Sequence, residues 1–481
     1  MRYLYIYTLI TVALFTSCDK FLDVKPAKEI TSKDLLSKRK GYETALGGLY
    51  YDMTLSSLYG SNLTYGLLDV LAGYWDISAV DHRYYRLNNY DYAAMESTMN
   101  SFWAPMYKII FNANNLINTL EKQNNLTADE RLVLGEAIGI RAFIHLDLFR
   151  LYGPVVKQEG LSARALPYRT QSNAVIEPFI TAGEYINLLK ADLLRSEELL
   201  KDDPILTNGG VANGNVSNGI DYNSLLDRRR TRFNINASTA LLARVYQILD
   251  DKQKAKEYAL KTLDNTSASF VTPANLTLST TADTRLTKEI IFGLYARDHY
   301  ADSRGHFGID GTSVNPNSSF YVNYDFMQNF IYTVGGDYRR SRWFQQSLSY
   351  TVFTRYAEPP AAQDQFLAYR PEISLISLSE LYFILAESFE STDLTKSYEY
   401  LNEIRKNRGM NVMLDMSTAS SENLYKELVL EARRQYFGEG QLFFLLKRLF
   451  SNIDKSASNS IPASLDIYKL PVPKSELDYN N

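Results

Sequence analysis

The chain has 481 residues, 45% of them hydrophobic and 22% charged, which is enough to bury a sizeable core. Its 51 basic and 55 acidic residues give a formal net charge of −4, so the charge attraction that dominates nucleic-acid affinity is missing and we expect no nucleic-acid partner. The single cysteine, Cys18, excludes an intramolecular disulfide and a cysteine-rich zinc site.

Residues 1–17 have the layout of a lipoprotein signal peptide. Arg2 is followed by an apolar run from Leu4 to Phe15, and two small residues precede Cys18. The run has about 12 residues, whereas a membrane-spanning helix needs roughly 20. A cysteine at the cleavage position resembles a bacterial lipobox, in which that cysteine becomes the lipidated first residue. We therefore expect Cys18 to carry a lipid anchor. An ordinary signal peptide that ends near a cysteine is the alternative.

Helical periodicity dominates the rest of the chain. In residues 135–153 (GEAIGIRAFIHLDLFRLYG), apolar side chains recur every three or four positions on two stripes. This pattern predicts a helix that is buried on most sides and ends at Gly153, before Pro154. His145 falls on one stripe, so we expect it to be a core histidine. Further helices are predicted at 102–121, 184–201, 237–249, 252–264, 377–391, 394–408 and 422–437, with short strands at 290–295 and 350–356.

Two pairs of predicted helices, within 237–264 and 377–408, are each joined by a short polar turn. Small residues on the first helix of each pair, such as Ala243 and Ala386, allow the two axes to approach closely. Each pair therefore resembles a tetratricopeptide-type hairpin, several of which must stack to bury a continuous face. Long loops, which are often functional or mobile, are predicted at 206–224 and about 295–325.

Five segments together carry a family resemblance. They are CDKFLD (18–23), EAIGIRAFIHLDLFRLYGPV (136–155), YLNEIRKNRGM (400–410), LYKELVLEARRQYFGEGQLFFLLKRLF (424–450) and LPVPKSELDYNN (470–481). In this order they resemble the RagB/SusD family of Bacteroidetes outer-membrane nutrient-binding lipoproteins, over nearly the whole mature chain. The resemblance implies a mainly α-helical SusD-like fold on tetratricopeptide-like hairpins, with long loops and a few short β-strands. It implies one domain over 18–481, with an N-terminal part at 19–200 and a C-terminal part at 280–481.

The resemblance also implies a place and a partner. Members of the family are held at the cell surface in the outer membrane, work with a SusC-like TonB-dependent transporter, and bind a glycan or another nutrient without being enzymes. One motif departs from the family pattern. Leu442 and Leu445 stand where members commonly have an arginine and an aspartate three residues apart, so we interpret this motif as architecture in which an apolar pair replaces an ion pair.

One predicted loop gathers histidines and carboxylates, namely Asp298, His299, Asp302, His306 and Asp310. The set lacks the ligand order of an EF-hand and the HExxH of a zinc protease, so we expect no metal there and no cofactor. The chain has no nucleophile elbow, phosphate-binding loop or dinucleotide fingerprint. Carboxylate pairs are too numerous to single out a glycosidase.

A binding site does not require the precisely spaced reactive groups of a catalytic site. Sugar rings present apolar CH faces and hydroxyl groups, so a glycan site combines exposed aromatic rings with polar side chains. Two segments, 73–92 and 294–308, have this mixture, and the resemblance places family ligand loops in these regions. The candidate ligand-binding residues are Trp75, Asp81, Tyr84, Tyr85, Arg86, Arg297, His299 and Tyr300.

Each candidate also has a structural explanation. Trp75 could fix its loop to the scaffold, Tyr84 and Tyr85 could point alternately inward and outward, and Arg297 could pair with a neighbouring aspartate. Our hypothesis is a surface lipoprotein that captures an oligosaccharide and passes it to a transporter. Two alternatives remain at this point, a lipid-anchored glycan hydrolase that uses the 298–310 cluster and a helical-repeat envelope scaffold that binds only proteins.

Overall fold

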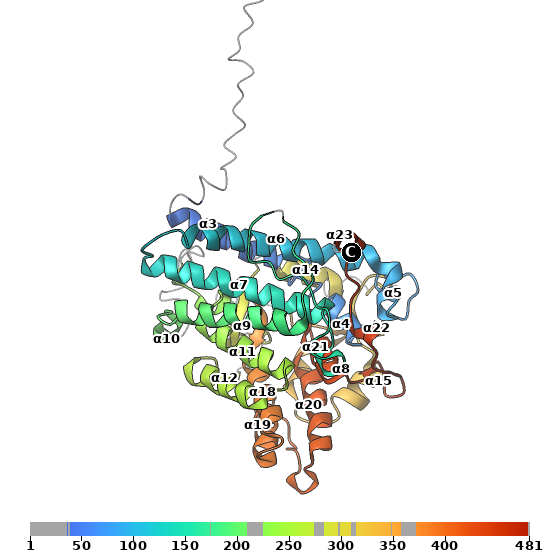
Figure 1. The fold of residues 1–481 in the computed structure, drawn as a ribbon. Coiled ribbons are helices and arrows are strands. Elements are labelled where there is room, and N and C mark those ends of the chain that lie inside the picture. The colour runs from blue at the N-terminus through green and yellow to red at the C-terminus, as the bar shows by residue number, and fades with distance from the viewer. Residues whose placement is uncertain are drawn as a thin grey trace, which may run out of the picture.

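The computed structural model describes residues 36, 39–173, 175–208, 225–273, 283–296, 299–308, 314–347, 349–356 and 372–479. The predicted signal peptide and Cys18 lie outside them. The chain is mainly α-helical, which confirms the predicted fold class (Figure 1). No helix in the described part is both long and apolar enough to span a membrane.

A series of long helices forms the scaffold, each packed against the next in chain order. Figure 1 shows them descending from α6 at the top to α19 at the bottom. Both predicted hairpins are present, as α11 with α12 and α18 with α19. The series consists of α6 (Glu96–Leu120), α7 (Ala128–Tyr152), α9 (Ala182–Leu199), α11 (Ile235–Ile248), α12 (Lys252–Asn265), α18 (Leu378–Phe389) and α19 (Leu394–Asn407).

Most predicted helix ends agree with the structure to within about two residues, as boundary assignments usually allow. Two helices begin earlier than predicted, α6 at Glu96 rather than at residue 102 and α7 at Ala128 rather than at residue 135. The early start of α7 has a clear cause. This helix begins seven residues before the apolar stripe because Thr127 and Glu130 form a capping box, each side chain accepting a hydrogen bond from the other's backbone N–H. The polar first turn belongs to the helix although it carries no apolar periodicity.

Other helices cover this scaffold. Helix α3 (Arg39–Thr54) packs on α6 and α7, α20 (Ser421–Gln435) packs on α18 and α19, and α21 (Gln441–Leu449) packs on α20. The remaining helices are short: α4 (Leu67–Leu71), α5 (Tyr85–Asn88), α8 (Val156–Glu159), α10 (Ile205–Asn208), α14 (His299–Phe307), α15 (Tyr324–Phe326), α16 (Tyr338–Trp343), α22 (Leu465–Tyr468) and α23 (Lys474–Tyr479).

The described strands form three two-stranded antiparallel sheets. Strands β1 (Ile290–Tyr295) and β4 (Glu372–Ser377) pair with a register shift, and β2 (Phe344–Ser347) forms a hairpin with β3 (Tyr350–Phe353). The third sheet joins β5 (Ile453–Asp454) to β6 (Ser460–Ile461). The strand predicted at 350–356 therefore ends earlier, at residue 353.

The motif that carries the family resemblance near the C-terminus is architectural, as predicted. Glu431 on α20 accepts hydrogen bonds from Arg339 (2.6 Å) and Arg434 (2.9 Å), and all three side chains are buried. Leu442 on α21 is fully buried, and Leu445 is half-buried. The ion pairs of Glu431 and the apolar side chains of Leu442 and Leu445 therefore contribute to the internal structure of this segment.

His145 is a satisfied core histidine, as its place on an apolar stripe predicts. Its Nδ1 lies 2.8 Å from the Tyr185 hydroxyl, and its ring stacks on Tyr168 with 3.9 Å between centroids. Burial lowers the pKa of His145 to about 3, so the ring is neutral at physiological pH.

Candidate functional site

The two segments proposed from sequence meet in one aromatic cluster, formed largely by Tyr65, Trp75, Tyr84, Phe307 and Phe320. The Trp75 ring stacks on Phe320 (5.3 Å between centroids, 25°), and the Tyr84 ring lies nearly parallel to Phe320 (5.6 Å, 11°). Phe307, from the second segment, also packs on Trp75. The cluster therefore joins residues 73–92 to the region around α14.

The cluster is a core, which corrects the expectation of exposed rings at Trp75 and Tyr84. Trp75 is only 4% exposed, and its Nε1–H donates to the Tyr65 carbonyl oxygen at 2.7 Å. Tyr84 is 7% exposed and donates its hydroxyl to Asn62 Oδ1 at 3.0 Å. Rings from a helix and a strand complete the cluster, because Phe307 in α14 and Phe353 in β3 also pack on Trp75.

His299 also turns inward. It lies in α14, is 3% exposed, and packs against Tyr65 and Tyr356. Burial lowers the pKa of His299 well below its ordinary value, with contributions from Arg285 and His306. A loop was expected here because the stretch is polar, but His299, Ser303 and Phe307 recur every four residues and are buried on one face of α14.

The other sequence candidates are placed as follows. Asp81 and Arg86 are exposed and Tyr85 is half-buried, with the Arg86 guanidinium 3.5 Å from Asp91. Arg297 and the Tyr300 side chain lie outside the described residues. The structure does not bring Asp81, Tyr85 or Arg86 into the hollow described next, and their role in ligand binding stays a prediction.

Directly beside the aromatic cluster, the surface is hollowed by about 500 Å³. Three chain segments form it, and two hydrogen bonds join them: the Asp76 N–H donates to the Tyr321 carbonyl oxygen and the Val322 N–H donates to that of Thr351, both at 2.9 Å. We call it the Tyr324 hollow. It is lined by Asp76, Ser78, Ala79, Pro316, Tyr321, Val322, Asn323, Tyr324, Asp325, Ser349, Tyr350 and Thr351.

The hollow combines rings with polar groups. Tyr324, in α15, is 50% exposed, and Tyr350 is half-buried with its ring edge-on to Tyr321 at 4.8 Å. Burial raises the pKa of Tyr321, so its hydroxyl is protonated at neutral pH. The exposed side chains of Asn323 and Asp325 lie beside these rings. This is the mixture that a shallow site for a polar, ring-containing ligand requires.

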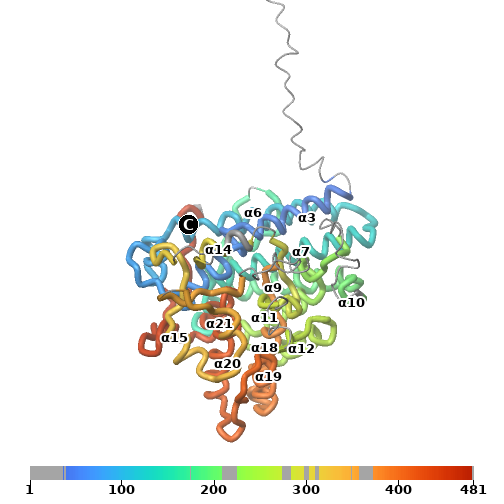
Figure 2. The backbone as a smooth tube through the Cα atoms, turned by 180° about the vertical axis from the view of Figure 1, so that it is seen from behind, coloured from blue at the N-terminus to red at the C-terminus, as the bar shows by residue number. Residues whose placement is uncertain are grey.

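Sequence reasoning missed the tyrosines of the hollow. The signal was present, because the stretch FYVNYDF (320–326) mixes aromatic, Asn and Asp residues as 73–92 does. It falls at the end of the predicted loop at 295–325. Seen from behind in Figure 2, α14 and α15 lie on the side of the molecule opposite to α10 and α12, as they do in Figure 1.

The described part of the chain holds no group of three or more His, Cys, Asp or Glu side chains placed to bind an ion. Asp298 and Asp310 lie outside this part, as does the side chain of Asp302.

The fold and this hollow define a helical-repeat protein with a shallow surface site. A family model of SusD-like proteins, described as starch-binding and associating with the outer membrane, matches residues 20–207. SusD-like protein P2 of Formosa agariphila is 22% identical over 96% of this chain and 94% of its own length. SusD-like protein P38 of the same organism is 25% identical over 40% of this chain, a match that spans only 36% of P38.

Solved structures share the fold over nearly the whole chain. A SusD superfamily protein from Bacteroides thetaiotaomicron has a TM-score of 0.70 at 21% identity, covering 91% of this chain and 97% of that one. A putative sugar binding protein from Bacteroides vulgatus has a TM-score of 0.69 at 20% identity, covering 92% and 96%.

Residues 20–207 are thus similar to the SusD-like family model, and the chain shares its fold with SusD superfamily structures, in agreement with the resemblance of the sequence motifs. The family model is described as starch-binding and one solved structure is named a putative sugar binding protein, which agrees with the expectation of a binding protein.

Proposed function

We propose that the protein is a lipid-anchored nutrient-binding protein of the outer membrane, which captures an oligosaccharide in the Tyr324 hollow. The observation that carries the proposal is the exposed Tyr324 ring beside Asn323 and Asp325. A sugar ring stacks its CH face on the phenol ring, while its hydroxyl groups bond to the amide and carboxylate groups.

The depth of the site supports capture followed by release. An open hollow leaves part of a ligand in water, which limits the affinity that it reaches. A dissociation constant of about 1 mM corresponds to only about −4 kcal/mol, and such a ligand leaves quickly. In our proposal the protein therefore delivers the glycan to a SusC-like TonB-dependent transporter.

The comparisons support the ligand class and the place. The matching family model is described as starch-binding and outer-membrane associated, and one solved structure with this fold is named a putative sugar binding protein. Anchoring through Cys18 rests on the sequence around it. The transporter as partner rests on the family resemblance.

Titration calorimetry of the purified protein against a panel of neutral oligosaccharides tests the site. For a glycan that binds, Tyr324→Ala is expected to weaken the affinity roughly 2- to 10-fold, because one aromatic contact contributes a free energy of about that size. Tyr51→Ala is the matched control, because Tyr51 on α3 is 67% exposed and does not line the hollow. Equal affinities in the wild type and Tyr324→Ala would contradict the proposal.

A further inference from the structure

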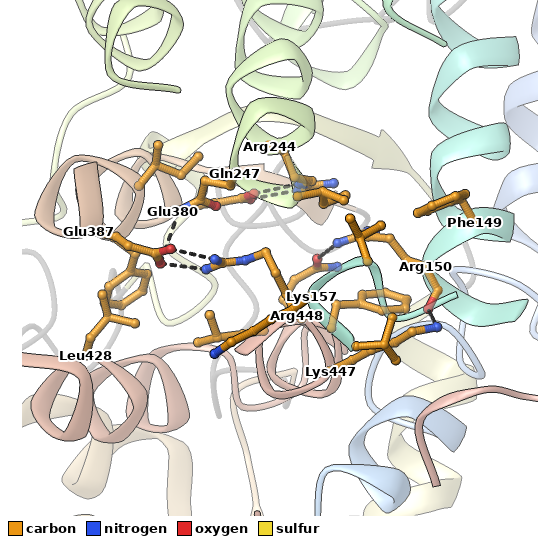
Figure 3. A pocket seen from close by; sticks show the side chains of 18 of the residues that line it. Phe149, Arg150, Lys157, Arg244, Gln247, Glu380, Glu387, Leu428, Lys447 and Arg448 are labelled. Atoms are coloured by element: carbon orange, nitrogen blue, oxygen red, sulfur yellow. Dashed lines mark hydrogen bonds and ion pairs between the residues drawn. The ribbon is translucent and has the colours of Figure 1, made fainter. Parts of the chain in front are cut away.

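A second cavity lies inside the helical scaffold, between the end of α7 and helices α8, α11, α18 and α21 (Figure 3). It encloses about 90 Å³. Since one water occupies about 10–15 Å³ by the same measure, this space holds roughly six to nine waters or one monosaccharide-sized molecule. Much of its wall is apolar, with Phe149, Phe383, Ile384 and Phe444 among the lining side chains.

An arginine in this wall has an unused hydrogen-bond donor. Arg244 is 5% exposed, and its Nε and Nη2 donate to the two carboxylate oxygens of Glu380 at 2.6 and 2.7 Å. The Nη1 of Arg244 is buried and has no acceptor among the described residues. A buried charged donor without an acceptor is costly, so this atom favours an incoming oxygen.

The cavity has an excess of positive charge. Its lining carries five basic side chains, which are Arg150, Lys157, Arg244, Lys447 and Arg448, against two carboxylates, Glu380 and Glu387. In Figure 3, Arg150 and Lys447 lie across the cavity from Glu387. Arg244 and Arg448 pair with the two carboxylates, and Arg150 pairs with Asp147, which does not line the cavity. The excess is therefore carried by Lys157, which is exposed, and by Lys447. Burial lowers the pKa of Lys447 to about 7, so it is partly protonated at neutral pH. The lining therefore favours an anion over a neutral or cationic ligand.

One side of the cavity adjoins a groove on the protein. It shares part of its lining, including Ile248, Glu387 and Arg448, with an adjoining groove of about 1050 Å³ that runs along α20 and the end of α21. Arg448 donates to both oxygens of Glu387 at 2.5 and 2.6 Å, so this ion pair borders both spaces. The cavity therefore adjoins the groove along these shared residues.

We propose that this cavity binds a monosaccharide-sized organic acid, a uronate, whose carboxylate accepts a hydrogen bond from Arg244 Nη1. The aliphatic face of the ring packs on Ile384 and the aromatic wall. The site is separate from the Tyr324 hollow and does not depend on the function proposed for it.

Calorimetry and thermal unfolding of the purified full chain with glucuronate and galacturonate test the proposal, with glucose as the uncharged probe. Saturable binding and a rise in melting temperature are expected with a uronate and not with glucose. Oligogalacturonate shows whether the acid enters free or as the end of a chain. Tyr324→Ala is expected to leave uronate binding unchanged, because Tyr324 lines only the other site.

Two variants locate the binding. Ile248→Trp places a large ring where the cavity adjoins the groove and is expected to reduce uronate affinity at least tenfold. Leu249→Trp is its control and should bind normally, because Leu249 lines the groove and not the cavity. If Ile248→Trp does not fold, Gln247→Glu adds a negative charge to the lining and is expected to weaken the uronate selectively.

Three results would overturn the proposal. They are an absence of saturable uronate binding, equal effects of glucose and uronate, and unchanged uronate binding in folded Ile248→Trp and Gln247→Glu. A crystal structure in excess glucuronate with only ordered water on Arg244 Nη1 would also overturn it.

Discussion

Asp76 donates its backbone N–H to the carbonyl oxygen of Tyr321 at 2.9 Å, and this bond joins two segments that lie far apart in the sequence. The residues just before them, Trp75 and Phe320, stack in the core at 5.3 Å. Neighbouring residues in an extended chain point to opposite faces. The same pairing therefore buries one aromatic pair and presents the next pair of residues, Asp76 and Tyr321, to the Tyr324 hollow.

Trp75 is predicted to matter for stability rather than for direct ligand contact. Trp75→Ala should lower the free energy of unfolding by about 3–5 kcal/mol, the usual cost of removing a large buried aromatic side chain. Trp75→Phe should cost less, because it keeps a ring against Phe320 and loses the Nε1–H bond to Tyr65. Denaturant unfolding measures both changes. Unchanged stability together with lost glycan affinity in Trp75→Ala would instead make Trp75 a ligand contact.

The scaffold could be predicted from sequence because its helices carry long apolar stripes and small residues at close contacts. Residues 135–153 and the two hairpins illustrate this, and both are present in the structure. The capping box at Thr127 and Glu130 was readable too, although apolar periodicity alone did not extend α7 to it. Apolar periodicity reflects which side of a single helix is buried, so it predicts helices of this kind.

The candidate site was harder to predict because loop side chains carry no periodicity that separates inward from outward. Trp75 and Tyr324 both belong to aromatic segments rich in Asp and Asn, yet one is 4% exposed and the other 50%. Their difference depends on the pairing of Asp76 with Tyr321, a long-range contact that composition does not encode. Of the two segments found by composition, 73–92 supplies Asp76, Ser78 and Ala79 to the hollow, whereas 294–308 reaches only the aromatic cluster, through Phe307.

Lipidation at Cys18 is predicted to decide where the protein resides. Cys18→Ser removes the residue that would carry the acyl chains. Each methylene of these chains that is buried in the membrane contributes about 0.8 kcal/mol to membrane affinity, and the variant loses that contribution. The variant is expected to leave the outer-membrane fraction in cell fractionation, whereas wild type stays there and is cleaved by protease added to intact cells. Ser17→Ala, which keeps the cysteine, is the control. Retention of Cys18→Ser in the outer membrane would contradict the anchor.

Two glycines are predicted to respond oppositely to alanine. Gly440 has φ +68°, and a Cβ there would lie 2.6 Å from the Leu63 carbonyl oxygen. Gly440→Ala should therefore lower the free energy of unfolding by more than about 2 kcal/mol. Gly47 lies inside α3, where an added Cβ would meet no atom within 4 Å, so Gly47→Ala should raise it by roughly 0.5–1 kcal/mol. Denaturant titrations compare the two, and equal effects would refute the steric explanation.

Glu431 is predicted to make stability depend on acid pH. Burial alone would raise its pKa, but the guanidinium groups of Arg339, Arg434 and Arg405 together lower it to about 2, below its ordinary value of 4.5. A carboxyl whose pKa is lower in the folded state stabilises the fold above its unfolded pKa. That contribution is lost as the pH falls from about 4.5 towards 2.

Glu431→Gln should accordingly cost about 3–5 kcal/mol at pH 7, since it leaves buried cations without their partner. The cost should shrink between about pH 5 and pH 2, because the wild type loses its charge there and the variant has none to lose. Urea unfolding across this range measures the difference. Glu427→Gln is the control, because Glu427 on the same helix is partly exposed, with its carboxylate 3.5 Å from Arg405. A cost for Glu431→Gln that stays constant with pH would show that its carboxylate does not titrate differently in the folded protein.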